Sequence, residues 1–295
     1  MNSMDDNPLL VETTWLDLRR RDQDLVILDT RRRTQHLMGH IPGAVSFPMR
    51  EVTDERLWSP GFLPSEEELR RRLGSAGFRR DDHLVVYDDG DGLAASRVFW
   101  ALDYLGHPRV SLLNGGFSKW SYEGRGRSLR RRKRPKASYE GSPVQQRLVG
   151  AEWILHRLAN GHDLFLIDCR SADEYTGARR KAARCGHIPG AVHVEWTHNL
   201  RETGACPVFR DREELLALYQ GAGADDGLPL VTYCQAQVRG SHTYFVLRWL
   251  GFKAVYGYEG SWGEWGNDPQ MPIATGDEPG RIVETREGER GKAPF

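Results

Sequence analysis

The sequence contains five short blocks of residues that each occur twice, in the same order, in the two halves of the chain. The clearest block, His-Ile-Pro-Gly-Ala-Val, begins at His40 and again at His187. The other pairs are 25–31 with 164–170, 85–87 with 231–233, 104–106 with 249–251, and 114–120 with 258–265. Chance does not produce five matches in one order, and internal repetition indicates a repeated structural unit. We therefore predict one domain used twice rather than two unrelated domains.

The repeat divides the chain into two domains, a linker and a tail. A length of 295 residues agrees with this division, because one domain typically takes roughly 150 residues. A change in block spacing places an insertion of about eight residues between Arg170 and His187. The tail has few large apolar residues, so we expect it to be partly disordered. The predicted segments are an N-terminal domain at 1–124, a linker at 125–143, a C-terminal domain at 144–274 and the tail at 275–295.

Each copy has the pattern of an α/β domain. Short, continuous apolar runs are typical of strands that are buried on both faces of a parallel sheet. These runs lie at 25–28, 84–87, 164–167 and 230–233. Helical patterns follow or separate them at 65–73, 212–219 and 241–250. Strands that alternate with helices predict a mainly parallel sheet flanked by helices in each copy.

Composition excludes several classes of protein. The chain has 41 Lys and Arg residues against 41 Asp and Glu residues, so its net charge is zero. This balance argues against a chain covered in basic charge for nucleic acid. No apolar run reaches the roughly 18 residues of a membrane span, and the first residues lack the pattern of a secretory signal. Four cysteines also make no disulfide framework. From these observations together we expect a cytoplasmic protein without a membrane partner.

The zero net charge conceals a strongly basic linker. Eight cations lie in it, namely Arg125, Arg127, Arg130, Arg131, Arg132, Lys133, Arg134 and Lys136. A charge run of this kind is usually a solvated connector, and we favour that interpretation. The alternative is a patch for nucleic acid or for an acidic partner.

Cys234 is the strongest candidate for chemistry. It follows the predicted strand 230–233, and the carboxyl ends of parallel strands form the ligand-binding edge of a sheet. The loop after it runs through Gln235, Ala236, Gln237, Val238, Arg239 and Gly240 into a predicted helix. Backbone N–H groups at a helix N-terminus bind anions, and the helix dipole together with Arg239 favours a thiolate. A thiolate is a nucleophile, whereas the alternative is an inert buried cysteine.

Six motifs together resemble the tandem-domain rhodanese family, the thiosulfate and 3-mercaptopyruvate sulfurtransferases. The resemblance covers residues 10–273 and implies two tandem rhodanese-like domains. It is carried by Gly39-His40-Ile41-Pro42-Gly43, Tyr87-Asp88-Asp89-Gly90, Asn114-Gly115-Gly116-Phe117, Gly186-His187-Ile188-Pro189-Gly190, Tyr233-Cys234, and the segment from Tyr258 to Trp265.

The resemblance implies a mechanism without metal or organic cofactor. The Cys234 thiolate would take the outer sulfur of a small anionic donor and form a persulfide. Cyanide, a thiol or a protein thiol would then accept the sulfur. In the first copy Asp88 stands in place of the cysteine, and a carboxylate cannot carry sulfane sulfur. We therefore expect the N-terminal domain to be catalytically inactive and to help form the cleft. Asp88, Asp89 and Asp91 are also compatible with a metal site, although a polar turn fits their spacing better.

The loop after Cys234 departs from the family pattern in ways that bear on the donor. The spacing from Cys234 to Arg239 is one residue shorter than the Cys-X5-Arg loop of the related phosphatases, which favours sulfur chemistry. The mercaptopyruvate branch has a serine where this chain has Ala236, and an aspartate and a histidine where it has Arg50 and Gly61. These losses favour thiosulfate. Gln237 replaces a glycine, which leaves the backbone conformation of the loop as an open question.

The sequence also implicates residues outside the Cys234 loop. The resemblance implies that arginines of the insertion, Arg179, Arg180 and Arg184, bind the donor's anionic group, although an exposed basic loop is the alternative. Asp168 and Arg170 either support the Cys234 loop or merely pair with each other. Two rival functions also remain open, a sulfur-relay partner with a dedicated protein donor or acceptor, and a non-catalytic binding module.

Overall fold

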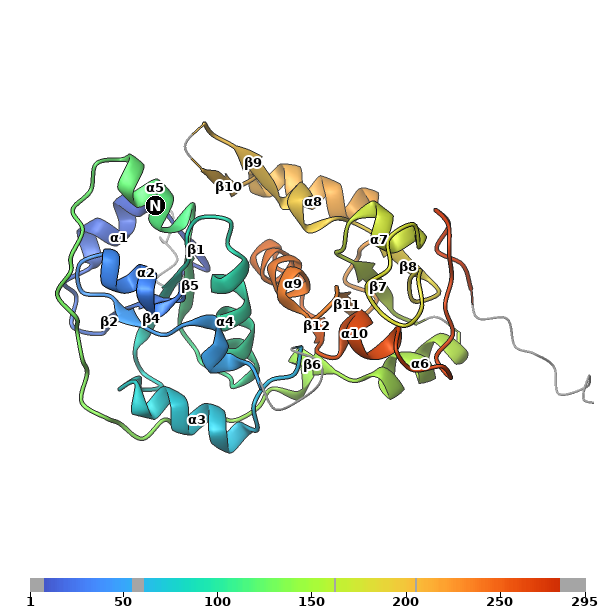
Figure 1. The fold of residues 1–295 in the computed structure, drawn as a ribbon, viewed down its shortest axis with the longest axis horizontal. Coiled ribbons are helices and arrows are strands. Elements are labelled where there is room, and N and C mark those ends of the chain that lie inside the picture. Colours follow the sequence, from blue (N-terminus) through green and yellow to red (C-terminus); the bar gives the residue numbers. More distant parts are fainter. Residues whose placement is uncertain (1–7, 55–60, 162, 205, 282–295) are drawn as a thin grey trace, which may run out of the picture.

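The computed structural model describes residues 8–54, 61–161, 163–204 and 206–281. Two α/β domains lie side by side, with the N-terminal domain on the left and the C-terminal domain on the right in Figure 1. Most of the expected tail, 282–295, lies outside the described residues. No helix of the described part has both the length and the apolar character needed to cross a bilayer.

The N-terminal domain is built on a five-stranded parallel sheet with the order β1-β5-β4-β2-β3. Its strands are β1 (Leu10–Val11), β2 (Leu25–Asp29), β3 (Val45–Ser46), β4 (His83–Tyr87) and β5 (Val110–Leu113). Its helices are α1 (Thr13–Arg19), α2 (Arg33–Met38), η1 (Met49–Val52), α3 (Glu66–Ser75), α4 (Leu93–Tyr104) and α5 (Gly116–Tyr122). Every residue of β2 and β4 is buried, as their continuous apolar runs predict.

The C-terminal domain repeats this topology, with the strand order β6-β12-β11-β7-β8. Its strands are β6 (Leu148–Val149), β7 (Phe165–Asp168), β8 (Ala191–His193), β11 (Leu230–Tyr233) and β12 (Val255–Tyr258). Its helices are η2 (Gln145–Arg147), α6 (Ala151–Ala159), α7 (Ala172–Thr176), η3 (Trp196–Asn199), α8 (Arg212–Gly221), α9 (Val238–Leu250) and α10 (Ser261–Trp265). An antiparallel pair, β9 (Leu200–Glu202) with β10 (Pro207–Phe209), has no equivalent in the described part of the first copy. The fold therefore confirms the predicted duplication.

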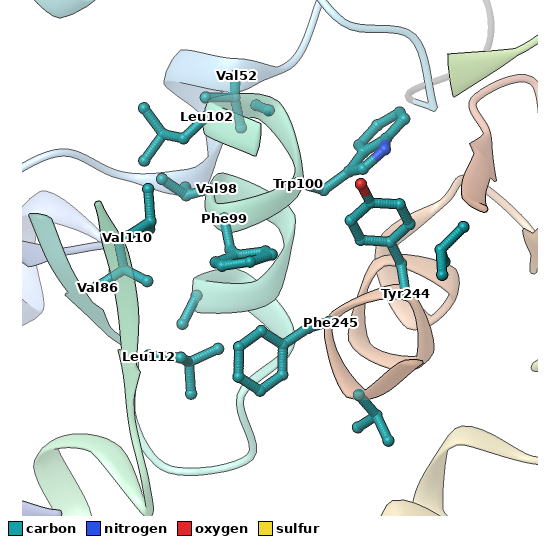
Figure 2. Close-up of a cluster of buried hydrophobic side chains, with 14 of the residues drawn as sticks. Val52, Val86, Val98, Phe99, Trp100, Leu102, Val110, Leu112, Tyr244 and Phe245 are labelled. Carbon is teal, nitrogen blue, oxygen red and sulfur yellow. The ribbon is translucent and has the colours of Figure 1, made fainter. Parts of the chain in front are cut away.

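The two domains meet through α4 and α9, the helices that leave the equivalent corners of the two sheets. Figure 2 shows Phe99 and Trp100 of α4 directed at Phe245 and Tyr244 of α9. The ring centroids of Phe99 and Phe245 are 4.9 Å apart and nearly perpendicular, an arrangement that aromatic pairs prefer. Buried residues of both domains belong to one continuous hydrophobic cluster. The interface therefore holds both helix N-termini, and the loops before them, in a fixed relation.

The linker lies along the N-terminal domain rather than crossing free solvent. Its backbone pairs with His40 at Ser128, and Arg134 binds both carboxylate oxygens of Asp82 at 2.8 and 2.9 Å. The second copy repeats the first contact, because His187 pairs with Ala274. Each His-Ile-Pro-Gly block thus fixes the segment that leaves its own domain.

Candidate active site

Cys234 lies at the carboxyl end of β11, in the middle of the C-terminal sheet. Its side chain is 1% exposed. Its backbone N–H donates to Ser261 Oγ at 3.3 Å, and its carbonyl accepts the N–H of Trp262 at 2.9 Å. Both partners belong to the first turn of α10. The start of α10 therefore determines the position of the Cys234 backbone.

The loop keeps a left-handed turn without the glycine that the family has there. Gln237, the residue before α9, has a φ of 52°, a conformation that costs a non-glycine residue about 1 kcal/mol or more. Its side chain is buried and bonds Thr232 Oγ1 at 3.2 Å. Space for it depends on Gly240 and Gly257, where an added Cβ would come within 2.2 and 2.5 Å of the Gln237 amide. Buried contacts therefore hold the strained turn.

Arg239 is bound to a carboxylate that the sequence analysis did not identify. Its guanidinium donates to both oxygens of Glu174 on α7, at 2.6 and 3.0 Å. Burial disfavours the Glu174 carboxylate, but the hydrogen bonds and charge of Arg239 outweigh burial and lower its pKa to about 2. Arg239 also interacts electrostatically with Cys234. The positive charge that Arg239 brings near Cys234 is therefore partly neutralised by Glu174.

Asp168 and Arg170 form a buried ion pair at 2.5 Å. Arg170 also donates to the carbonyl of Gly186 at 2.8 Å and lies 4.6 Å from the ring of Trp262.

The N-terminal domain contains the same arrangement. There Arg31 pairs with Asp29 at 2.7 Å, donates to Gly39 O at 2.8 Å and lies 3.9 Å from the ring of Phe117. The pair is thus a feature of the fold in both copies, and it reaches Cys234 indirectly through Trp262.

The three arginines of the insertion do not converge on the cysteine. Arg184 donates to the carbonyls of Met271 at 2.7 Å and Trp265 at 2.9 Å. Arg180 bonds a carbonyl of its own loop, and Arg179 is exposed. Within the described residues none of the three bonds the Cys234 loop. The insertion instead contacts that loop through its backbone, because Gln235 Nε2 donates to Lys181 O at 3.1 Å.

Arg97 of α4 reaches the loop from the other domain, although the sequence analysis did not identify it. Its guanidinium is fully buried, with Nη2 2.7 Å from Gly61 O and Nη1 3.5 Å from Gln237 O. Burial lowers its pKa to about 10, against the charges of Glu259 and Cys234. A sequence signal existed, because Arg97 is the charged residue within the mostly apolar stretch 93–102.

The equivalent place in the N-terminal domain, the loop between β4 and α4, holds a carboxylate. Asp88 Oδ1 accepts the N–H groups of Gly90 at 3.0 Å and Gly92 at 3.1 Å, and its Oδ2 accepts that of Ala95 at 3.2 Å. Burial, together with the charge of Asp91, raises its pKa to about 6 against the effect of these bonds. No group of three or more potential metal ligands occurs in the described part of the chain. The three N–H groups therefore form a cradle that the protein fills with its own carboxyl side chain.

Sequence comparisons assign the family. The sequence model of the rhodanese-like domain matches residues 12–123 and again 150–268. A thiosulfate sulfurtransferase of Azotobacter vinelandii is 35% identical over 271 residues, which cover 90% of this chain and 97% of that protein. One from Corynebacterium glutamicum is 36% identical over 284 residues, which cover 91% of each chain. The sulfur carrier protein TtuD of Thermus thermophilus is 34% identical over 297 residues, which cover 92% of this chain and 98% of that protein.

Solved structures agree with this assignment. The anaerobic ergothioneine biosynthesis enzyme from Chlorobium limicola, solved with trimethyl histidine, superposes with a TM-score of 0.79 at 25% identity. The match covers 91% of this chain and 70% of that one. EanB, solved with ergothioneine covalently linked to a cysteine persulfide, superposes with a TM-score of 0.80 at 25% identity and the same coverage. The chain thus belongs to the rhodanese family and is a sulfurtransferase built from two rhodanese-like domains.

Proposed function

We propose that this protein moves a sulfane sulfur from an anionic donor, with thiosulfate preferred over 3-mercaptopyruvate, to a thiophilic acceptor through a persulfide on Cys234. One observation carries the proposal. Cys234 occupies the sheet corner whose duplicate, at Asp88, directs three backbone N–H groups at an anion. A thiolate or persulfide at the same corner is an anion of the same charge, and such donors stabilise developing negative charge.

The proposed reaction is a double displacement. The Cys234 thiolate attacks the outer sulfur of thiosulfate, forming a sulfur–sulfur bond to Cys234 while the bond within thiosulfate breaks. Sulfite leaves with the electron pair. The acceptor, which is cyanide, a thiol or a protein thiol, then attacks the terminal sulfur and releases the Cys234 thiolate. Neither step needs an oxidant, a metal or an organic cofactor.

The surroundings of the loop support thiosulfate as the donor. Sulfite leaves as a stable anion, whereas the carbon leaving group of 3-mercaptopyruvate needs a proton. A Cβ at Gly61 would come within 2.0 Å of Glu259 O and 3.3 Å of the Ala236 carbonyl carbon. No side chain fits there, and neither Gly61 nor Ala236 has a proton to give. We assign Arg179 and Arg180 to initial attraction of the donor, because both are exposed cations on the loop that Gln235 contacts.

A second candidate is a role in sulfur relay with a dedicated protein donor or acceptor. It is favoured by the 34% identity to the sulfur carrier protein TtuD. The basic linker adds a surface for such a partner. Within the described residues Arg131, Lys133 and Lys136 have no ion pair, and they line a groove of about 530 Å³ on the N-terminal domain.

Intact-mass measurement tests the proposal. After incubation with thiosulfate, the protein should gain the mass of one sulfur atom, and the gain should be smaller with 3-mercaptopyruvate. Cys234→Ser should abolish the gain. Cys185→Ser, a change at a half-buried free cysteine, should preserve it. A gain with a persulfide-bearing protein but not with either small donor would favour the relay. No gain from any donor would overturn the proposal and leave a non-catalytic module.

A further inference from the structure

One charged side chain at the domain interface lacks the counterion that its burial demands. Arg97 is fully buried, and no carboxylate of the described residues forms an ion pair with it. Its Nε has no hydrogen-bond partner, while Nη1 and Nη2 bind backbone carbonyls. Burying an unpaired charge costs several kcal/mol, and a buried donor without a hydrogen-bond partner calls for an explanation. The guanidinium also lies 4.7 Å from the ring of Trp100, and an anion that forms beside it during a reaction would supply the missing negative charge.

The repeat shows which residue takes the place of Arg97 in the other copy. Arg97 and His242 are each the fifth residue of their helices, α4 and α9. Both are fully buried and both have a nitrogen without a partner. Each also faces the loop of the opposite domain. Arg97 contacts the Gln237 carbonyl, and a Cβ on Gly92 would lie 3.2 Å from His242 Nε2.

The two residues differ in charge, and the difference follows the loop that each one faces. Burial lowers the pKa of His242 to about 3, so this ring is neutral where it faces the loop of Asp88, whose carboxylate already has three backbone donors. Burial lowers the pKa of Arg97 to about 10, which leaves a cation at neutral pH. The permanent charge thus faces the loop whose cysteine must become an anion.

We propose that Arg97 supplies part of the charge that holds Cys234 as a thiolate and then as a persulfide anion. The domain without a cysteine would thereby contribute an electrostatic and positioning residue to the active site. This inference rests on the function proposed above. Opposite charges attract more strongly where water is excluded, and a nearby cation favours the ionised form of an acid. The contact with Gln237 O fixes the guanidinium against the end of the loop.

Other titratable groups face this pair and do not replace Arg97. Arg239 interacts with Cys234 but is bound to a carboxylate of its own domain. Cys169 also faces Cys234, and burial raises its pKa, which keeps it a neutral thiol. Glu259 faces Arg97, but its carboxyl accepts a backbone N–H, and burial raises its pKa. Arg97 is therefore the cation near Cys234 that lacks an ion pair among the described residues.

The pH dependence of Cys234 alkylation tests the inference on the full-length protein. The rate of iodoacetamide modification would be followed on the Cys234 peptide by mass spectrometry. In Arg97→Met the pH of half-maximal rate should move upward by about one unit, the scale expected for loss of a nearby opposite charge. Arg97→Lys should keep most of the original profile. Arg248→Met is the matched control, because Arg248 pairs with Asp103 in the same interface at 3.1 Å.

Folding is checked by thermal unfolding, and Arg97→His, which copies the residue of the other half, serves if Arg97→Met does not fold. An unchanged profile in a folded Arg97 variant would overturn the inference, as would an equal shift in Arg248→Met. Alkylation needs no sulfur donor. A wild-type protein that forms no persulfide would therefore refute the proposed function, whereas an unmoved alkylation profile would refute the role of Arg97.

Discussion

Asp88 and Cys234 each begin the loop, here called a corner, that joins a central strand to the next helix. The two corners have the same architecture, but one holds a hydrogen-bonded carboxylate and the other a buried cysteine. In the first, β4 ends at Tyr87 and α4 begins at Leu93, and the loop closes around its own carboxylate. In the second, β11 ends at Tyr233 and α9 begins one loop residue earlier. The first loop is already occupied by a carboxylate, whereas in the second the proposed nucleophile interacts with Arg97, which has no ion pair among the described residues.

The comparison separates what the fold needs from what the chemistry needs. The ion pair of Asp168 with Arg170 recurs as that of Asp29 with Arg31, so it belongs to the fold. The pair of Glu174 with Arg239 is found in the second copy, whose equivalents in the first are Gln35 and Ala94. Features that differ between the two copies, such as Glu174 against Gln35 and Arg97 against His242, are therefore those to test for catalysis.

The largest expected effect comes from replacing Cys234 with aspartate, the residue that the first copy has at the equivalent position. Cys234→Asp should lower sulfur transfer by at least about 10⁴-fold, because loss of a nucleophile removes the covalent route. We expect the carboxylate to be accepted, since Asp88 shows that such a corner binds one. Activity assays and urea unfolding would measure both effects, with Cys234→Ala as the control. If Cys234→Asp were less stable than Cys234→Ala by more than about 2 kcal/mol, a large effect for one substitution, the two corners would not be equivalent cradles.

An intermediate effect is expected from Glu174→Gln, which gives the second copy the residue of the first. The variant should lose about 2 kcal/mol of unfolding free energy, because it leaves Arg239 without a charged partner, while the amide can preserve the cap with Ser171. Glu174 has a pKa of about 2 in the folded protein, below its ordinary 4.5. Its contribution is therefore fully present above pH 4.5 and is lost as the pH falls toward 2. Glu174→Gln should lack this acid-dependent part.

Urea unfolding at pH 7 and at pH 3 would measure the difference. Glu152→Gln, at an exposed first-turn glutamate of α6, is the matched control and should leave both values unchanged. A Glu174→Gln variant as stable as the wild type at pH 7 would show that the ion pair does not stabilise the second copy.

Sequence reasoning located what lies close along the chain and missed what the fold brings together. The duplication, the parallel sheets and the corner at Cys234 follow from local runs and repeated blocks. Glu174, Arg97 and His242 did not emerge, because each acts on a loop far away in the chain and no spacing rule connects them. The pair β9 and β10 was missed as well, since strands of three residues carry almost no periodic signal.

The smallest expected effect concerns the carboxylate of the first corner. Asp88 has a pKa of about 6 in the folded protein, above its ordinary 3.8. Between these pH values the folded state holds a proton that the unfolded state releases, so wild-type stability should fall as the pH rises through this window. Asp88→Asn should lack this slope and change the unfolding free energy by only about 1 kcal/mol, because its amide oxygen still accepts N–H groups. Urea unfolding between pH 4 and 7 would measure the pH dependence of the unfolding free energy. Asp81→Asn, at an exposed aspartate, is the control. If the slope persisted in Asp88→Asn, another group would carry it, and the first corner would no longer serve as the model of a filled cradle.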